Sequence, residues 1–299
     1  MKTLVRRSTA IVTFLGLLGL ALTLPQMRHL ERFADLLVVA PRRKTLAQLA
    51  LQELDGVDPS NLANFFRISP WEPDDVRLPL IRFILAYLLK HRPRHDSPIY
   101  FTLDDSLTHK DKGTHQLQGV DWHFDHNSQR TVKGGCPIVL RIHWGDFHFP
   151  LTWRFYLRQS TVRRLNRDKR RRHKPRLHYR SKLQLAQAIL TRYRLRWRQE
   201  VDYWHVKLQL GLGDFRLQSY EAIAKWYAVV YVVLVYLYWH GYEQCGVGKA
   251  SMGLSEVLAR MRQEHQREVL RAACAEVTNG ASLEDVVTRY AGPANVPAA

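Results

Sequence analysis

Four polar side chains share one side of the helix that residues 193–207 (YRLRWRQEVDYWHVK) predict. They are Tyr193, Arg196, Glu200 and Lys207. At 3.6 residues per turn, all four fall within an arc of about 60° that borders the apolar face. Charges beside a buried face are costly unless they are paired or used. An ordinary salt bridge between Arg196 and Glu200, four residues apart, also satisfies this spacing.

A second carboxylate stands at the end of a predicted strand, where the apolar run SPIYFTLDDS closes with Asp104 and Asp105. An acid after a strand, a glutamate on a later helix and a basic chain together indicate metal-dependent phosphoryl transfer. Two divalent ions about 3.5–4 Å apart need several carboxylates to hold them, and Mg²⁺ and Mn²⁺ prefer such oxygen ligands. Zinc is disfavoured, because His123 and His126 have no second pair at ligand spacing.

Helices are predicted ahead of this strand, over residues 26–90. TLAQLALQEL begins with a capping box of Thr45 and Gln48. DPSNLANFF begins with Asp58 as N-cap and Pro59 in the first turn. The resulting helix–turn–helix is typical of proteins that read DNA and also of ordinary helix pairs, so both interpretations stay open.

Strands and further helices are predicted after residue 97. CPIVLRIHW and FHFPLTWRFYLR form a hairpin around Gly145 and Asp146. SKLQLAQAIL, from Ser181, predicts a helix. The run WYAVVYVVLVYLYW (226–239) predicts a buried helix that is short for a membrane span. Two amphipathic helices are expected from residue 254 onward.

The charge distribution points to a polyanionic partner. The net charge is +18, which favours nucleic acid over a membrane surface. Residues 163–182 hold eleven Lys or Arg and a single acid, Asp168, and predict an arm that neutralises phosphates. Its candidate DNA-binding residues are Arg163, Arg164, Arg167, Lys169, Arg170, Arg171, Arg172 and Lys174.

Both chemical segments resemble one known family. YRLRWRQEVDYWHVK matches the Y-(2)-R-(3)-E-(6)-K signature of DDE insertion-sequence transposases. IYFTLDDSLTHKDKG is similar to the family's first-acid segment, where an Asp ends the first strand and Thr or Ser follows at the second position. Because Ser106 stands there in this chain, Asp104 is the candidate acid. The resemblance covers roughly residues 30–240.

The resemblance implies an α/β fold with an RNase H-like mixed sheet, here incomplete, a helical N-terminal region and C-terminal helices. Asp104 and Glu200 would be catalytic and ligate Mg²⁺ or Mn²⁺. Arg196 and Lys207 would contact phosphates, and Tyr193 would support the site. The implied partner is DNA, as the element's terminal repeats and target. No small-molecule substrate or membrane is expected, and a homodimer stays open.

One part of the family's pattern has no match. The family places its second Asp at the end of a fourth strand, between the third strand and the glutamate helix. Here the third strand ends near Arg158, the signature begins at Tyr193, and Asp168 is the sole acid between them. An internal deletion would produce this, and would fuse SKLQLAQAIL and YRLRWRQEV into one helix of about 30 residues, since no Gly or Pro interrupts it. We therefore expect DNA binding without strand cleavage, as in a transposase remnant that interferes with intact copies; an active enzyme is the rival hypothesis.

The predicted organisation has three parts. Residues 1–92 form a helical DNA-binding region, 93–245 a truncated RNase H-like core with the basic arm, and 246–299 the C-terminal helices and tail. The N-terminal run Ala10–Leu24 resembles a signal peptide. It is short for a span and no A-x-A site follows, so a core helix, or a start codon assigned too early, is preferred to an exported or membrane-associated protein. Three scattered cysteines favour the reducing cytoplasm, where the protein would associate with the nucleoid.

Overall fold

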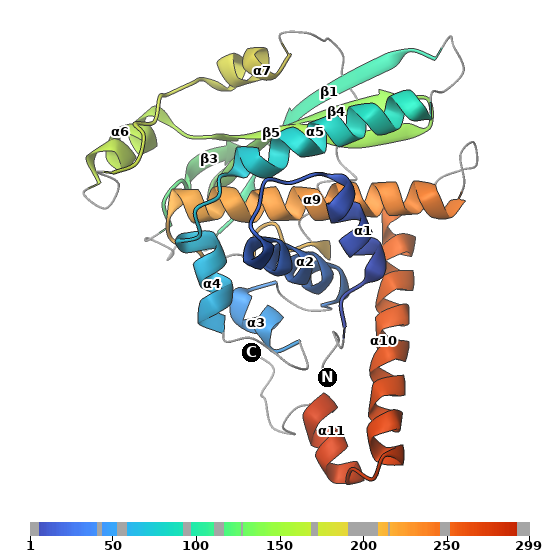
Figure 1. The fold of residues 1–299 in the computed structure, drawn as a ribbon. Helices are drawn as coiled ribbons and strands as arrows, with labels where there is room; N and C mark the ends of the chain where they lie inside the picture. The colour runs from blue at the N-terminus through green and yellow to red at the C-terminus, as the bar shows by residue number, and fades with distance from the viewer. Residues whose placement is uncertain are drawn as a thin grey trace.

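The computed structural model describes residues 6–40, 44–52, 59–91, 97–110, 117–126, 128–168, 173–190, 209–214, 216–245 and 252–291. A sheet lies at one end of the molecule, and helix α9 (Tyr220–Cys245) runs beneath it (Figure 1). The helices of residues 24–67 lie on the other side of α9, whereas the helix of residues 73–90 lies alongside the sheet (Figure 1). Buried apolar residues from these layers form one continuous core.

Five helices precede the sheet: α1 (Thr9–Leu17), α2 (Leu24–Val39), α3 (Leu46–Ala50), α4 (Pro59–Arg67) and α5 (Pro73–Lys90). The predicted N-cap of α3 is confirmed, since the Thr45 hydroxyl accepts the Gln48 N–H at 3.3 Å. The predicted start of α4 at Pro59 is also confirmed, while Asp58 lies outside the described residues. Helix α3 ends at Ala50, earlier than the sequence pattern indicates.

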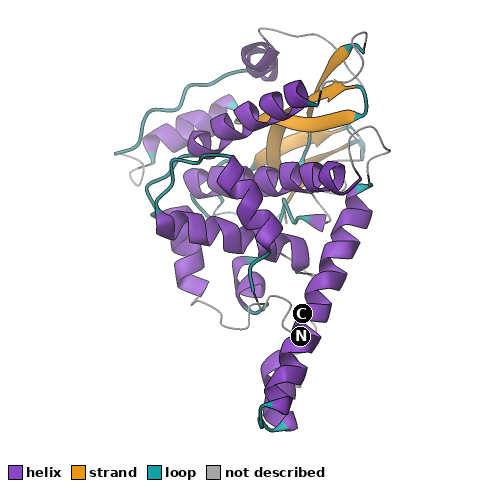
Figure 2. Cartoon of the chain, turned by 45° about the vertical axis from the view of Figure 1, so that its right-hand side comes forward, coloured by secondary structure: helices purple, strands orange, loops and turns teal. Residues whose placement is uncertain are grey.

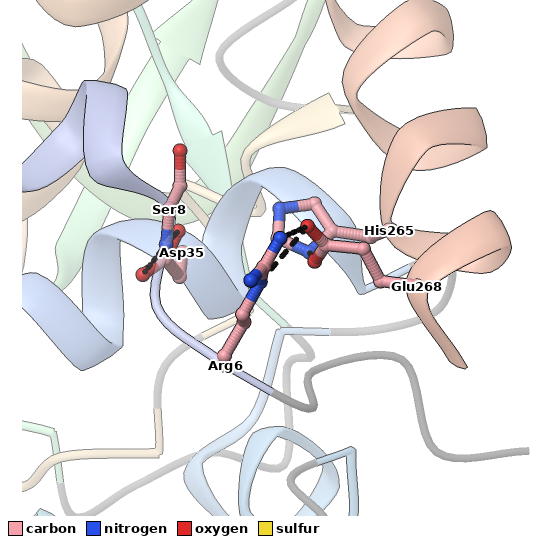
Figure 3. A network of polar contacts seen from close by, with 5 residues as sticks. All are labelled: Arg6, Ser8, Asp35, His265 and Glu268. Carbon is pink, nitrogen blue, oxygen red and sulfur yellow. Dashed lines mark hydrogen bonds and ion pairs between the residues drawn. The ribbon is translucent and has the colours of Figure 1, made fainter. Parts of the chain in front are cut away.

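The N-terminal apolar run forms a core helix, as predicted. Phe14 in α1 is fully buried, and its ring lies 5.4 Å from that of Tyr236 and 5.3 Å from that of Trp239. The start of α1 is held by Asp35 of α2, whose two carboxylate oxygens both accept the Ser8 N–H at 3.2 Å (Figure 3). Burying this run against α9 removes apolar area from water, which is the main stabilising contribution of such a helix.

The sheet consists of β1 (Ile99–Asp105), β2 (Thr108–His109), β3 (Asp121–Asp125), β4 (Arg130–Trp144) and β5 (Phe147–Tyr156). Every described pair is antiparallel, and β4 is central: its first half pairs with β2 and β3, its second half with β1 and β5. The predicted hairpin is confirmed, with Gly145 at a φ of 57°, a conformation that glycine adopts without strain. In an RNase H-like sheet, the strand that carries Asp104 is expected to be central. Among the described strands β1 pairs only with β4, so it lies at an edge of the sheet. Its other side has no partner among the described strands, since none follows β5 in the described part of the chain.

Helix α9 is buried along most of its length, as the sequence predicts for its apolar run. By length and composition it could cross a membrane, but 89% of its most apolar window is buried inside the protein. On one side the ring of Tyr231 stacks on Trp153 of β5 at 4.6 Å. On another side Trp226 lies 5.6 Å from Phe66 of α4. Helix α9 therefore packs against both the sheet and the N-terminal helices and joins their buried apolar residues into one core.

The remaining described helices are α6 (Gln159–Arg167), α7 (Lys182–Leu190), α10 (Leu254–Thr278) and α11 (Leu283–Ala291). Helix α10 extends away from the body and α11 folds back along its far end (Figure 2). Both C-terminal helices and α7 are confirmed predictions. The expected continuation of α7 into the signature segment lies outside the described residues.

Candidate functional site

Asp104 lies on the face of the sheet that is turned toward α9. It stands opposite Val139, which in turn stands opposite Trp153, the residue that stacks on Tyr231 of α9. Directly opposed residues in an antiparallel pair share a face. The carboxylate is partly buried, and its Oδ1 accepts the Asp105 N–H at 2.9 Å. The first candidate acid is therefore held near the end of β1, next to the main core.

Asp105 lies on the opposite face, because successive side chains on a strand alternate. There its Oδ2 accepts hydrogen bonds from the Lys182 ammonium at 2.6 Å and from the Cys136 thiol at 3.3 Å. Burial, together with the Asp105 carboxylate, raises the pKa of the Cys136 thiol far above its ordinary value. Asp105 thus attaches α7 to the sheet, and the strand register places its side chain and that of Asp104 on opposite faces, as the alternation predicts.

The two described flanks of the signature segment contact the sheet at different places. On the N-terminal side, Lys182 begins α7 and contacts Asp105. On the C-terminal side, residues 209–214 lie against the chain that follows β2, where the Lys110 ammonium donates to the Gly213 carbonyl. Tyr193, Arg196, Glu200 and Lys207 themselves lie outside the described residues.

Two lysines, the buried Lys44 and the partly buried Lys110, hold the 209–214 loop in place. The Lys44 N–H donates to Asp214 Oδ2 at 2.7 Å, and its ammonium donates to the carbonyl of Ala40 at the end of α2. Burial lowers the pKa of Lys44 to about 7, with the nearby Arg262 adding to the effect. Burial likewise lowers the pKa of Lys110 to about 8. The loop that follows the signature is therefore fixed to both the helical layer and the sheet.

A basic helix flanks the sheet on the side of β3. Arg163, Arg164 and Arg167 of α6 are exposed, while Val162 and Leu165 on its other side are buried in a small apolar cluster. Three exposed guanidinium groups on one short helix suit contacts with phosphates. Among the other candidate DNA-binding residues, Lys174 is exposed, and Lys169, Arg170, Arg171 and Arg172 lie outside the described residues.

Asp168, the sole acid between β5 and the signature, serves as a tether. Its Oδ2 accepts a hydrogen bond from Gln118 Nε2 at 2.7 Å, and Gln118 Oε1 accepts one from the Tyr220 N–H at the start of α9. Within the described residues between Tyr156 and Leu190 there are α6, an extended segment and α7, but no strand. Asp168 therefore stands at the end of a helix and not at the end of a strand.

No group of three or more His, Cys, Asp and Glu side chains able to hold a metal is found among the described residues. His123 is buried beside Tyr156, whereas His126 is exposed in the turn that follows β3. Asp104 supplies one carboxylate of the oxygen type that Mg²⁺ and Mn²⁺ bind.

Helices at both ends of the chain and a partial antiparallel sheet of five described strands define an α/β protein of the RNase H-like DDE type. Residues 20–206 match the family described as DDE superfamily endonuclease, and the chain belongs to that family. The matched range includes both Asp104 and Glu200. No curated protein and no solved structure matches the chain.

Proposed function

We propose that this chain is a DDE-type transposase that binds DNA but does not cleave it, because the second acid of its catalytic set is missing. Family membership makes DNA the substrate. The observation that carries the proposed defect is the path of the chain after β5. The described part of that path contains no strand, and its single acid is bound to Gln118.

The candidate site would be built around Asp104 and Glu200, which would hold a divalent ion such as Mg²⁺ or Mn²⁺. Such an ion polarises a phosphoryl oxygen and lowers the pKa of bound water. Arg196 and Lys207 would contact the phosphates, and Tyr193 would support the site. The contact of Gly213, after the signature, with Lys110, six positions after Asp104, supports this grouping. On the N-terminal side, Lys182 contacts Asp105 on the opposite face of the sheet. With Asp105 on the other face, two carboxylates remain where a two-ion site needs more.

DNA binding would depend mainly on the exposed basic residues of α6 and of the segment after it. Their guanidinium and ammonium groups would release counterions from the phosphate backbone, which gives affinity without sequence preference. The ends of the parent element and its target would be the ligands, encountered in the cytoplasm at the nucleoid. A copy that binds these ends without cutting them would compete with intact transposases.

The test is a binding and nicking experiment with purified protein, Mn²⁺ and duplex DNA that carries the element's terminal sequences. We expect a stable complex and no strand breaks. Metal-dependent nicking that is lost in Glu200→Gln and in Asp104→Asn would overturn the proposed defect. Asp105→Asn is the matched control, since it removes a neighbouring carboxylate that lies on the opposite face.

A further inference from the structure

Two aromatic side chains are exposed together on strand β3. The side chain of Trp122 is 40% exposed and that of Phe124 is 50% exposed. Between them His123 points to the other face and is buried, so the two rings share one solvent-facing side of the strand. Large aromatic groups usually dominate cores and interfaces, so such a pair on an open strand indicates a surface that binds something.

The surroundings of this pair are cationic. Trp122 stands opposite Lys133 of β4, and the Arg158 guanidinium donates to the Trp122 carbonyl at 2.9 Å. Burial would raise the pKa of Asp121, but its hydrogen bonds to Thr161 and the Trp122 N–H, with the nearby charges of Arg158 and Arg164, lower it overall. Asp121 is thus ion-paired with Arg158. Asp125, the other acid of β3, accepts a hydrogen bond from the Ser128 hydroxyl at 2.7 Å and lies 3.3 Å from His109 Nε2.

Helix α6 is attached to the same strand. The Thr161 hydroxyl donates to the Asp121 carboxylate, which fixes the exposed arginines of α6 beside β3. The Asp121 side chain lies on the face of β3 opposite Trp122, so α6 is fixed beside the strand, and Lys133 and Arg158 are the cations shown next to Trp122. Interfaces with other proteins are depleted of charge at their centre, whereas aromatic rings among cations suit a polyanion whose bases can stack.

We propose that Trp122 and Phe124 form a stacking platform for unpaired bases of single-stranded DNA, with Lys133 and Arg158 holding the adjacent backbone. The inference rests on the proposed DNA-binding function and specifies its ligand further: a duplex with a single-stranded tail. Base–aromatic stacking tolerates any sequence, because every base has a π-face, and Arg adds cation–π attraction. The platform would therefore favour open or frayed ends over any particular sequence.

Fluorescence anisotropy with a blunt duplex, and with the same duplex carrying a short oligo-dT tail, tests this. We expect the wild-type protein to prefer the tailed duplex. Trp122→Ala should lower affinity for the tailed duplex by about fivefold or more and leave the blunt duplex unaffected. Trp122→Phe keeps a ring and should retain most of the preference. Tyr100→Ala is the matched control, since Tyr100 is 46% exposed on β1, and it should change neither affinity.

The outcomes separate the two proposals. If wild-type protein binds neither DNA, the proposed function is wrong and the platform has no ligand. If it binds both equally, and Trp122→Ala and Phe124→Ala change neither, the platform alone is wrong. A changed oligomeric state of Trp122→Ala on size-exclusion chromatography, with unchanged DNA affinity, would assign the surface to a protein partner and would also overturn it.

Discussion

The exposed arginines of α6 give a prediction whose size follows from charge. Replacing Arg163, Arg164 and Arg167 together by Ala removes three cations from a helix whose apolar side stays packed. Each phosphate contact contributes about 0.9 to the slope of log affinity against log salt on duplex DNA, so the slope should flatten by about 2.7. Raising the salt from 50 to 200 mM weakens binding by some factor. By the same relation, that factor should be about 40 times smaller for the variant than for the wild-type protein.

The assay is a salt titration of binding to an arbitrary duplex, followed by anisotropy. Arg260→Ala, Arg267→Ala and Arg271→Ala combined form the control, because they remove the same charge from exposed positions on α10. If binding depends on contact with α6, the control slope stays close to that of the wild-type protein. Equal flattening in both variants would show that only the net charge matters, and an unchanged slope in the α6 variant would refute the proposed contacts.

Three further predictions concern stability, measured by urea unfolding. Burial raises the pKa of Asp35 well above 3.8, so the wild-type protein should lose stability as the pH rises from about 4 toward that raised pKa. Asp35→Asn should abolish this decline, at most about 1.4 kcal/mol per pH unit. Burial lowers the pKa of Lys44 from 10.5 to about 7, so the free energy of unfolding should rise as the pH rises between these values. Lys44→Met should flatten this rise, and parallel plots of stability against pH for the two proteins would contradict the prediction. Phe14→Ala should cost about 3–5 kcal/mol and Phe14→Leu clearly less, whereas a negligible loss would argue against α1 as a core helix.

The sequence predicts the local structure around Asp104 well, because that structure follows from short-range rules. A strand that ends in Asp104 and Asp105 must turn the two carboxylates to opposite faces, and the register has them so. The hairpin at Gly145 follows from turn chemistry in the same way. Contacts between distant residues are different. No local pattern in the sequence shows that Asp105 pairs with Lys182, 77 positions later in the chain.

The exposed aromatics of β3 show a second limit. In the stretch DWHFDH the sequence presents the two histidines as candidate metal ligands and indicates no role for Trp122 and Phe124. In the structure His123 is buried, whereas Trp122 and Phe124 are exposed. The period-two alternation in the sequence indicates which side chains share a face but not which face is buried, since burial is decided by the elements that pack on the sheet. The edge position of β1 among the described strands was likewise beyond the sequence pattern.

The position of α9 at the centre of the molecule has a consequence for synthesis on the ribosome. The N-terminal helices end at Lys90, whereas the helix that covers them ends at Cys245. At a synthesis rate of about 5–20 residues per second, α9 is completed about 8–30 s after the N-terminal helices, whose apolar faces stay uncovered by it until then. Phe66 has no Trp226 to pack against during this interval, and Phe14 has no Tyr236. A nascent chain cut short before residue 220 therefore carries these apolar faces without the helix that would cover them, which makes it a substrate for chaperones and proteases.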